Sequence, residues 1–214
     1  MHRTIGLWIA DIRSLKKRET DYLQLLQSGA RNNALRFVQQ EDRLYRIVSS
    51  LMLYHVLGIK DDGALPRNEY GKPESLLAGQ HFNLSHSGNY TVLAVADIPV
   101  GVDIEPFGTD PLPQIPHRLW CKDEIARLIA EPTKECFAYL WTRLESALKA
   151  DGKGFSLPER TFSVLDDGHP WYFQSLVHDE HMISCAAAEH FELNVSLLSP
   201  ETLMEFSQHN ILLS

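Results

Sequence analysis

The sequence predicts an α+β fold, with helices and mainly antiparallel strands in each half of the chain. Apolar residues recur every three or four positions between residues 21 and 57, as in amphipathic helices. Strand-forming residues instead fill 90–96, 170–177 and 182–188, and turn residues separate the last two segments, as in an antiparallel meander. Because helices precede antiparallel strands in each half, the element order indicates a weak similarity between the halves, although no sequence repeat is visible.

The first half is expected to begin with a strand over residues 4–10, which are mostly apolar. The helical stretch that follows is expected to end at Gly58, because glycine adopts the left-handed conformation of a helix C-terminus without steric cost. Turn-rich sequence comes next. Phe82 and Leu84 then alternate with polar neighbours, as in a short strand, and the apolar segment 90–96 is predicted to be a buried strand.

The second half is expected to start after residue 100, because proline and glycine become frequent beyond residue 105. We therefore divide the chain into a first lobe, 1–100, and a second lobe, 101–214. Pro132 separates two expected helices, one from about Lys122 and the other from about Lys134 to Ala150. Strands are expected after them at 161–165, 170–177 and 182–188.

Length, charge and cysteine content favour a cytoplasmic protein. The chain has 214 residues, begins without a signal-peptide pattern and contains no apolar run near the ~20 residues that span a bilayer. Its net charge of −8 argues against a nucleic-acid partner. Its three cysteines lack metal-binding spacing, and so sparse a set favours a reducing compartment over a disulfide framework. We therefore expect no membrane and no nucleic-acid partner.

Two acidic residues stand at the end of the expected strand 101–105. Because side chains alternate faces along a strand, Asp103 and Glu105 point to one side while their apolar neighbours point to the other. Pro106 follows and ends the strand, since proline has no N–H to donate. The pair is either two solvated acids on an ordinary strand or two carboxylates that converge on one hard cation.

A helix in the second half carries a third carboxylate beside two lysines. Trp141, Glu145 and Lys149 step by four residues and therefore share one face of an α-helix. On periodicity alone, a surface Glu–Lys pair is the favoured explanation. Two glycines, however, bracket Lys153 directly after the helix and make a flexible cationic turn there. Three carboxylates with two lysines are what a magnesium–phosphate site needs.

A small polar turn is expected at 85–88, before the strand 90–96. It offers the hydroxyl of Ser85, the imidazole of His86 and backbone N–H groups to an anion. The alternative is that His86 is a turn histidine bonded to a nearby carbonyl oxygen. This segment alone supports both interpretations equally.

Together, these segments resemble the 4′-phosphopantetheinyl transferase family in its longer, monomeric, two-lobed type. Three blocks carry the resemblance: Phe82-Asn83-Leu84-Ser85-His86-Ser87-Gly88, Gly101-Val102-Asp103-Ile104-Glu105, and Trp141-x-x-Leu144-Glu145-Ser146-x-x-Lys149 followed by Gly152-Lys153-Gly154. The segments Tyr70-Gly71-Lys72-Pro73 and Arg118-Leu119-Trp120-Cys121-Lys122-Asp123-Glu124 also match. Each block alone is a weak signal, but all five occur in the family's order and spacing across roughly residues 5–190.

The resemblance implies two lobes related by a pseudo-two-fold axis, each a small sheet packed with helices. It also implies an enzyme that moves the 4′-phosphopantetheine arm of coenzyme A onto a serine of an apo carrier protein, leaving 3′,5′-ADP. In that reaction Asp103, Glu105 and Glu145 would hold Mg²⁺ at the coenzyme A diphosphate. Glu145, or a water that it orients, would take the serine proton. The implied coenzyme A contacts are Lys149, Lys153, Ser85, His86, Lys72 and Arg46.

Two departures from the family pattern concern phosphate binding. Leu144 stands where the family usually has a lysine before the glutamate of the helix motif, so a phosphate contact is expected to be missing there. The segment 30–33 carries only Arg31 where relatives often place lysines, which is expected to weaken binding of the 3′-phosphate. Both departures lower the number of cations expected around coenzyme A.

The resemblance implies an acyl, peptidyl or aryl carrier protein as the protein substrate of a monomeric enzyme. Carrier proteins are typically acidic, so docking to this acidic chain is expected to rest on a local patch, for which the segments 107–120 and 121–128 are candidates. Two alternatives remain open. One is a Mg²⁺-dependent phosphohydrolase that uses the same carboxylates. The other is a degenerate relative that binds coenzyme A or a carrier protein without transfer.

Overall fold

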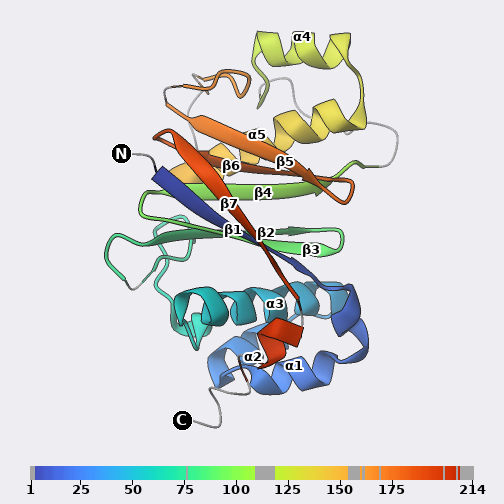
Figure 1. Cartoon of the computed structure of the whole chain (residues 1–214), viewed down its shortest axis with the longest axis vertical. Coiled ribbons are helices and arrows are strands. Elements are labelled where there is room, and N and C mark those ends of the chain that lie inside the picture. The colour runs from blue at the N-terminus through green and yellow to red at the C-terminus, as the bar shows by residue number, and fades with distance from the viewer. Residues whose placement is uncertain are drawn as a thin grey trace.

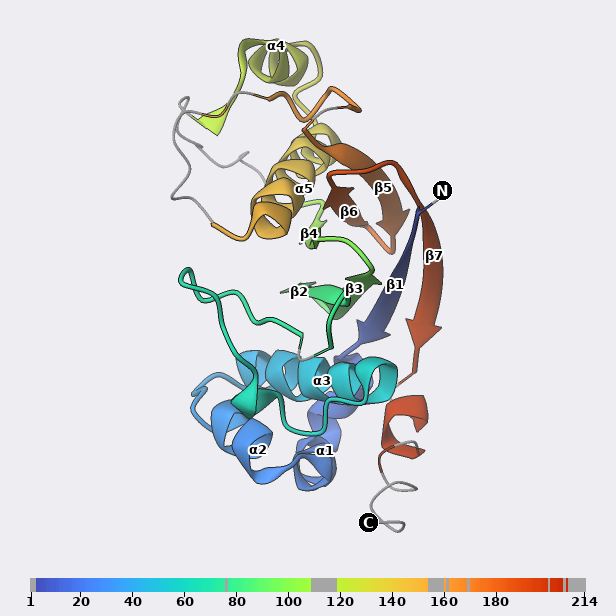
Figure 2. The ribbon, with the colours of Figure 1, turned by 90° about the vertical axis from the view of Figure 1, so that its left-hand side faces the viewer.

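Two β-sheets lie face to face between two layers of helices in the computed structural model of the chain (Figure 1). The structure describes residues 3–75, 77–108, 119–153, 160, 162–168, 170–199, 201–205 and 207. Helices from the first half cover the outer side of one sheet, and helices from the second half cover the outer side of the other (Figure 2). This layered arrangement confirms the predicted α+β fold.

The first sheet contains β1 (Arg3–Asp11), β2 (His81–Ser87), β3 (Tyr90–Ala96) and β7 (Phe191–Leu198). Their order is β2-β3-β1-β7. β3 is antiparallel to both of its neighbours, whereas β7 runs parallel to β1. The outer side of this sheet is covered by α3 (Gln40–Leu57), which packs with α1 (Glu19–Leu25), α2 (Ser28–Ala34) and the 3₁₀ helix η1 (Arg13–Lys17).

The second sheet contains β4 (Val100–Pro106), β5 (Tyr172–His178) and β6 (His181–Ala187). Its order is β4-β6-β5, and both pairs are antiparallel. The helix α5 (Lys134–Asp151) packs along β4 and β6, and α4 (Lys122–Ala130) lies on the far side of α5. β4 and β2 are therefore both edge strands, and they come together where the two sheets meet.

The two halves repeat one arrangement of elements. The strand order β2-β3-β1 in the first half matches β5-β6-β4 in the second, and each half places an 18-residue helix on the outer side of its sheet. Both helices end at a left-handed glycine, Gly58 with φ 69° and Gly152 with φ 77°, as predicted for Gly58. β7 follows the second repeat and pairs with β1 in the first sheet, so the two halves interlock.

The central hydrophobic core lies between the two sheets and fixes which way β4 faces. Val102 and Ile104 are 0% exposed there, among apolar side chains of both sheets. Burial of such a side chain contributes roughly 1.5–3 kcal/mol, so the opposite orientation of β4 is strongly disfavoured. Asp103 and Glu105 therefore point away from this core, toward α5, as their alternation with apolar residues predicts.

Two local predictions were wrong. Residues 162–165 form a loop and turn rather than a strand, because Val164 is buried as a single anchor whose N–H donates to Glu124 Oε1 at 2.7 Å. In the segment 85–88, residues 85–87 belong to a strand and the turn begins only at Gly88. β2 continues through Ser87, because its backbone keeps pairing with β3 as far as Tyr90. The polar side chains of this segment are therefore presented by a strand.

Cys121, Cys136 and Cys185 are free thiols, and the last two are buried. No helix in the part of the chain that the structure describes is long and apolar enough to cross a bilayer.

Candidate active site

A cleft of about 320 Å³ opens where β2 and β4 meet under α5. Figure 2 shows β4 between α5 and the hairpin β2–β3, so this cleft draws on both halves of the chain. It is lined by residues from three predicted segments: Leu84, Ser85, His86, Asp103, Glu105, Trp141, Glu145 and Lys149. The structure thus brings together six of the predicted site residues.

A glycine allows α5 to lie directly on β4. An alanine Cβ at Gly101 would overlap the carbonyl oxygen of Ser146 and would lie 2.5 Å from the backbone nitrogen of Ala150. Real Cβ atoms do not approach other heavy atoms so closely. Gly101 therefore sets the separation between the acidic strand and the helix that carries Glu145 and Lys149.

Asp103 is the most enclosed carboxylate of the cleft, at 4% exposure. Its Oδ1 accepts hydrogen bonds from Lys149 Nζ at 2.6 Å and from Ser85 Oγ at 2.9 Å. Among the residues that the structure describes, its buried Oδ2 has no hydrogen-bond partner. A buried oxygen without a partner costs roughly 1–3 kcal/mol, so this atom favours binding of a donor or a cation.

The other two carboxylates, Glu105 and Glu145, have pKa values above the ordinary value of a glutamate. Burial raises the pKa of Glu145 to about 7, and the charges of Asp103 and Glu105 add to this effect, while Lys149 opposes it. Burial, followed by the charge of Asp103, also raises the pKa of Glu105. Ser87 Oγ donates to Glu105 Oε2 at 2.9 Å. Three carboxylates and a single lysine leave the cleft with excess negative charge.

The donor set of the cleft suits a hard divalent cation that a substrate helps to bind. Within the described residues, no group of three His, Cys, Asp or Glu side chains is close enough to hold a metal ion. Mg²⁺, however, commonly takes one or two carboxylates and completes its octahedron with water and substrate phosphates. The unpartnered Oδ2 of Asp103 and the crowded charges of Glu105 and Glu145 fit that mode of binding.

His86 is oriented by an aromatic residue that sequence reasoning missed. Its ring stacks on Tyr45 of α3 with centroids 4.2 Å apart and an interplanar angle of 14°. Tyr45 also donates from its hydroxyl to the carbonyl oxygen of Gly88 at 2.5 Å. Although the side chain of His86 is exposed at the cleft mouth, the surrounding protein and then Lys149 lower its pKa. In the sequence, the spacing of Tyr45 along its helix indicates only a core residue. The contact with His86 therefore could not be predicted.

The two remaining predicted lysines lie outside the cleft. The Nζ of Lys72 donates to carbonyl oxygens at the end of α5 and on β4, at 2.6 Å from Lys149 O and 3.3 Å from Val100 O. Burial lowers the pKa of Lys72. Lys153 is exposed and its Nζ lies 3.4 Å from Asp151 Oδ1. Gly154, the second glycine of that predicted turn, lies outside the described residues.

Arg46 lines a separate hollow of about 410 Å³ in the first half of the chain. Arg36 and Arg67 line the same hollow, so three guanidinium groups gather there. Arg46 is held by an ion pair of 2.5 Å with Asp62 Oδ2, and Asp62 Oδ1 accepts from Ser50 Oγ at 3.0 Å. The sequence did not indicate that Arg67, from a distant turn, joins the other two.

Leu144 lies in the hydrophobic core and does not line the cleft. It is 1% exposed and packs in the hydrophobic cluster between α5 and the second sheet. On an α-helix, successive residues point about 100° apart, so Leu144 faces the core when Glu145 faces the cleft. Leu144 therefore makes no contribution to the cleft, and the absence of a cation at this position stays a prediction about phosphate binding.

The fold and the cleft define an α+β protein of two repeated halves with an acidic, lysine-bearing site between them. Residues 14–97 match the family model described as "4′-phosphopantetheinyl transferase, N-terminal", and residues 99–196 match that of the 4′-phosphopantetheinyl transferase superfamily. The chain is 31% identical to the 4′-phosphopantetheinyl transferase Sfp of Bacillus subtilis (strain 168), across 90% of this chain and 96% of the relative.

Two further relatives match in part. The 4′-phosphopantetheinyl transferase psf-1 of Bacillus pumilus is 32% identical across 77% of this chain and 75% of its own length. The 4′-phosphopantetheinyl transferase gsp of Aneurinibacillus migulanus is 34% identical across 61% of this chain and 57% of its own length. The chain belongs to the 4′-phosphopantetheinyl transferase family, which confirms the family and the enzyme class predicted from its motifs.

Proposed function

We propose that this chain transfers the 4′-phosphopantetheine arm of coenzyme A to a serine of an apo carrier protein, with Mg²⁺, and releases 3′,5′-ADP. The observation that carries the proposal is the cleft between β2, β4 and α5. It gathers Asp103, Glu105, Glu145 and Lys149 from segments far apart in the sequence. These are the groups that binding of a magnesium diphosphate requires.

In this proposal Asp103, Glu105 and Glu145 would hold Mg²⁺ together with phosphate oxygens of the substrate, because the three carboxylates do not form a metal-binding group by themselves. Asp103 Oδ2 is the oxygen available as a first ligand. When bound, Mg²⁺ neutralises charge on the diphosphate and on the leaving 3′,5′-ADP. Lys149 adds a positive charge from α5, with its Nζ already in place beside Asp103. With a cation on Asp103, the ammonium of Lys149 would be free to pair with the diphosphate.

Glu145 is the proposed proton acceptor for the carrier serine. The serine oxygen attacks the phosphorus that carries the pantetheine arm, the bond from that phosphorus to the ADP oxygen breaks, and the serine proton passes to Glu145. A base works best when its pKa lies near the working pH, and the pKa of Glu145 is raised to about 7 by burial. This value belongs to the metal-free protein, and Mg²⁺ on the same carboxylate would lower the pKa, so Glu145 would take the proton directly or through a water that it orients.

The nucleotide end of coenzyme A is proposed to lie toward the first half of the chain. Ser85 and His86 border the cleft on that side. The hollow lined by Arg36, Arg46 and Arg67 is proposed to receive a terminal phosphate and so to compensate for the few cations in the segment 30–33. Arg46 would do so while paired with Asp62, and Arg67 while donating to the carbonyl oxygen of Gly71. Lys72 and Lys153 remain predicted contacts. Lys72 would have to exchange its bonds to carbonyl oxygens for the ligand.

The protein substrate is proposed to dock beside α4 and the segment 107–120. Residues 109–118 of that segment lie outside the described residues. α4 contributes Lys122 and the exposed Ile129, which offer a local charge and an apolar contact despite the net charge of −8. We take the enzyme to be a cytoplasmic monomer, and its free cysteines agree with a reducing compartment.

Mass spectrometry of carrier proteins tests this function. The protein, Mg²⁺ and coenzyme A are incubated with apo carriers of the peptide-synthase, polyketide and fatty-acid types. We expect at least one carrier to gain the mass of a 4′-phosphopantetheine group. No gain on any carrier would contradict the transferase. Phosphate or nucleotide released without a carrier would favour the phosphohydrolase, and binding without transfer would favour the non-catalytic relative.

A further inference from the structure

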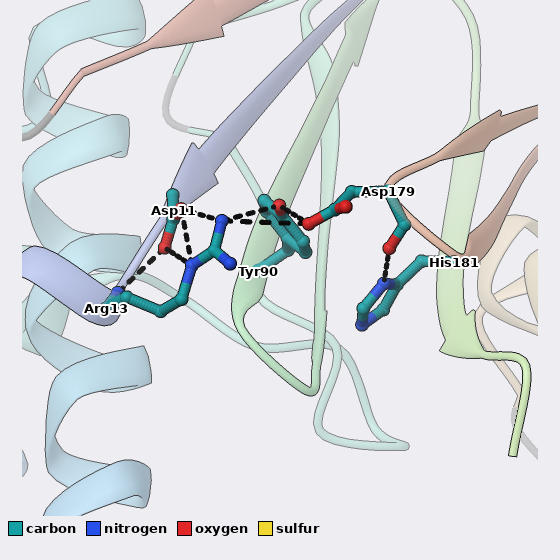
Figure 3. A network of polar contacts seen from close by, with 5 residues as sticks. All are labelled: Asp11, Arg13, Tyr90, Asp179 and His181. Carbon is teal, nitrogen blue, oxygen red and sulfur yellow. Dashed lines mark hydrogen bonds and ion pairs between the residues drawn. The ribbon is translucent and has the colours of Figure 1, made fainter.

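A chain of polar contacts joins the two halves of the protein next to the candidate active site (Figure 3). Tyr90, at the start of β3, is 3% exposed, and its hydroxyl donates to Asp179 Oδ2 at 2.6 Å. Arg13 donates to the same phenol oxygen at 3.1 Å and to Asp11 Oδ2 at 2.6 Å. Asp179 belongs to the hairpin β5–β6, so the hydrogen bond from Tyr90 connects the first half of the chain to the second.

The turn that carries Asp179 is strained. Asp179 and Glu180 form a two-residue hairpin turn, and both have positive φ angles, of 44° and 58°. Such conformations favour glycine, asparagine or aspartate and cost other residues roughly 1–3 kcal/mol, so the strain falls on Glu180. A structure keeps them only where its surroundings over-determine them. The carboxylate of Asp179, bonded to Tyr90 and 3.6 Å from Arg13, ties this turn to the first half of the chain, in addition to the β5–β6 pairing that closes the turn.

The same turn is bonded to the end of the acidic strand. The carbonyl oxygen of Glu180 accepts from the N–H of Phe107 at 2.8 Å, two residues after Glu105. His181 stands opposite Pro106 in the ladder between β4 and β6, and its Nδ1 lies 2.7 Å from the carbonyl oxygen of Asp179. The position of this turn therefore constrains the position of Glu105.

The partner of the turn in the first half is equally close to the site. Tyr90 stands opposite Ser87 across the β2–β3 turn, and Ser87 Oγ donates to Glu105 Oε2. Between them lies Gly88, with φ 59°, where a Cβ would overlap Nε2 of His181. The hairpin ends of the two halves are thus in direct contact, and both ends lead to Glu105.

We propose that the Tyr90–Asp179 hydrogen bond is a latch that fixes β4 against β2 and thereby positions Glu105 and Ser87 for binding of Mg²⁺ and coenzyme A. Tyr90 and Asp179 act as positioning residues, because they hold other groups and do not line the cleft. This inference rests on the proposed function. Burial, followed by the bond to Asp179, raises the pKa of Tyr90 to about 12, so the phenol remains a donor throughout the neutral range.

The other end of β1 offers a matched control. Arg3 donates to Asp97 Oδ2 at 2.5 Å and to Glu189 Oε2 at 3.0 Å, and so also ties turns of the two halves together. This clamp lies at the start of β1, whereas the latch lies beyond its end. Removing the Arg3 contacts shows whether the loss of a contact between the halves elsewhere in the molecule also weakens binding at the site.

The test compares Asp179→Gly, Asp179→Asn, Tyr90→Phe and Arg3→Gln. Titration calorimetry measures the Kd for coenzyme A with Mg²⁺ and without a carrier protein, and hydrogen exchange measures protection of residues 103–107 in the ligand-free protein. Asp179→Gly relaxes the turn but removes the bond, so we expect the Kd to rise about 5-fold or more and exchange to accelerate. Tyr90→Phe should have the same effects. The double variant Asp179→Gly/Tyr90→Phe should have a Kd no higher than that of the single variant with the higher Kd, because both substitutions remove the same hydrogen bond.

Asp179→Asn keeps an acceptor for Tyr90 and suits a positive φ, so we expect its Kd to stay within about twofold of wild type. Arg3→Gln should also stay within that range. The latch is refuted if Asp179→Gly and Tyr90→Phe bind and exchange like wild type, or if Asp179→Asn or Arg3→Gln weakens binding as much as they do. Failure of the wild-type protein to bind coenzyme A would instead overturn the proposed function, and with it this inference.

Discussion

At the level of single residues, the cleft buries carboxylates whose charge lowers the free energy of unfolding but whose raised pKa suits them to proton transfer. Glu145 is the clearest case, because burial raises its pKa from an ordinary 4.5 to about 7. Below pH 4.5 the carboxyl group is neutral in both the folded and the unfolded chain. Above pH 7 it is ionised in both, and the folded protein then bears the full cost of a buried charge.

We therefore predict that Glu145→Gln raises the free energy of unfolding of the metal-free protein above pH 7. The gain should reach up to about 3 kcal/mol, less any screening by solvent, and should vanish below pH 4.5. Denaturant unfolding at pH 4, 6 and 8 measures it, with the exposed Glu135→Gln on the same helix as control. A gain that is independent of pH, or equal in the control, would contradict the assigned burial of Glu145.

Leu144 gives a second prediction at this scale. A lysine at that position would restore the family's usual residue but would place an ammonium group in the core beside α5. We predict that Leu144→Lys lowers the free energy of unfolding by several kcal/mol and does not lower the KM for coenzyme A. Leu144→Met is the size-matched control and should cost less than about 1.5 kcal/mol. A lower KM with unchanged stability would show that the side chain reaches the ligand.

At the scale of elements, the site depends on how closely α5 approaches β4. Gly101 leaves no room for a Cβ against the backbone of α5, whereas nothing among the described residues lies within 4 Å of a Cβ at Gly168. We predict that Gly101→Ala lowers the melting temperature by about 10 °C or more and abolishes transfer, while Gly168→Ala changes neither. Thermal unfolding followed by circular dichroism measures the first effect. Equal melting temperatures for the two variants would refute this packing.

The periodicity of the sequence predicted the strand and the helix that carry the site. It did not predict the contacts between segments that are distant in the sequence. Alternation on β4 and the four-residue step on α5 depend on local geometry, so the orientation of Asp103, Glu105 and Glu145 could be read from the sequence. The stack of Tyr45 on His86 and the carbonyl contacts of Lys72 depend on packing between distant segments. A residue pattern within one element holds no information about such contacts.

At the scale of the whole molecule, the repeat of one helix–sheet unit explains why the site is divided. The element order indicated a similarity between the halves, and the matching orders β2-β3-β1 and β5-β6-β4 confirm it. The pairing of β7 with β1 could not be predicted, because the two strands are nearly the full chain length apart and share no local signal. The edge strands β2 and β4 meet between the halves, and α5 covers β4, which carries Asp103 and Glu105.

The carboxylates between the halves are proposed to carry out the transfer. Their role is tested by the rate at which Asp103→Ala and Glu145→Ala transfer 4′-phosphopantetheine to a carrier protein, at saturating coenzyme A and Mg²⁺. The surface variant Asp97→Ala, from the turn before β4, serves as control. We predict a fall of at least about 100-fold for each cleft variant, with unchanged circular dichroism and a near-normal rate for the control. A folded Asp103→Ala or Glu145→Ala protein that keeps a near-normal rate would show that these carboxylates do not carry out the transfer.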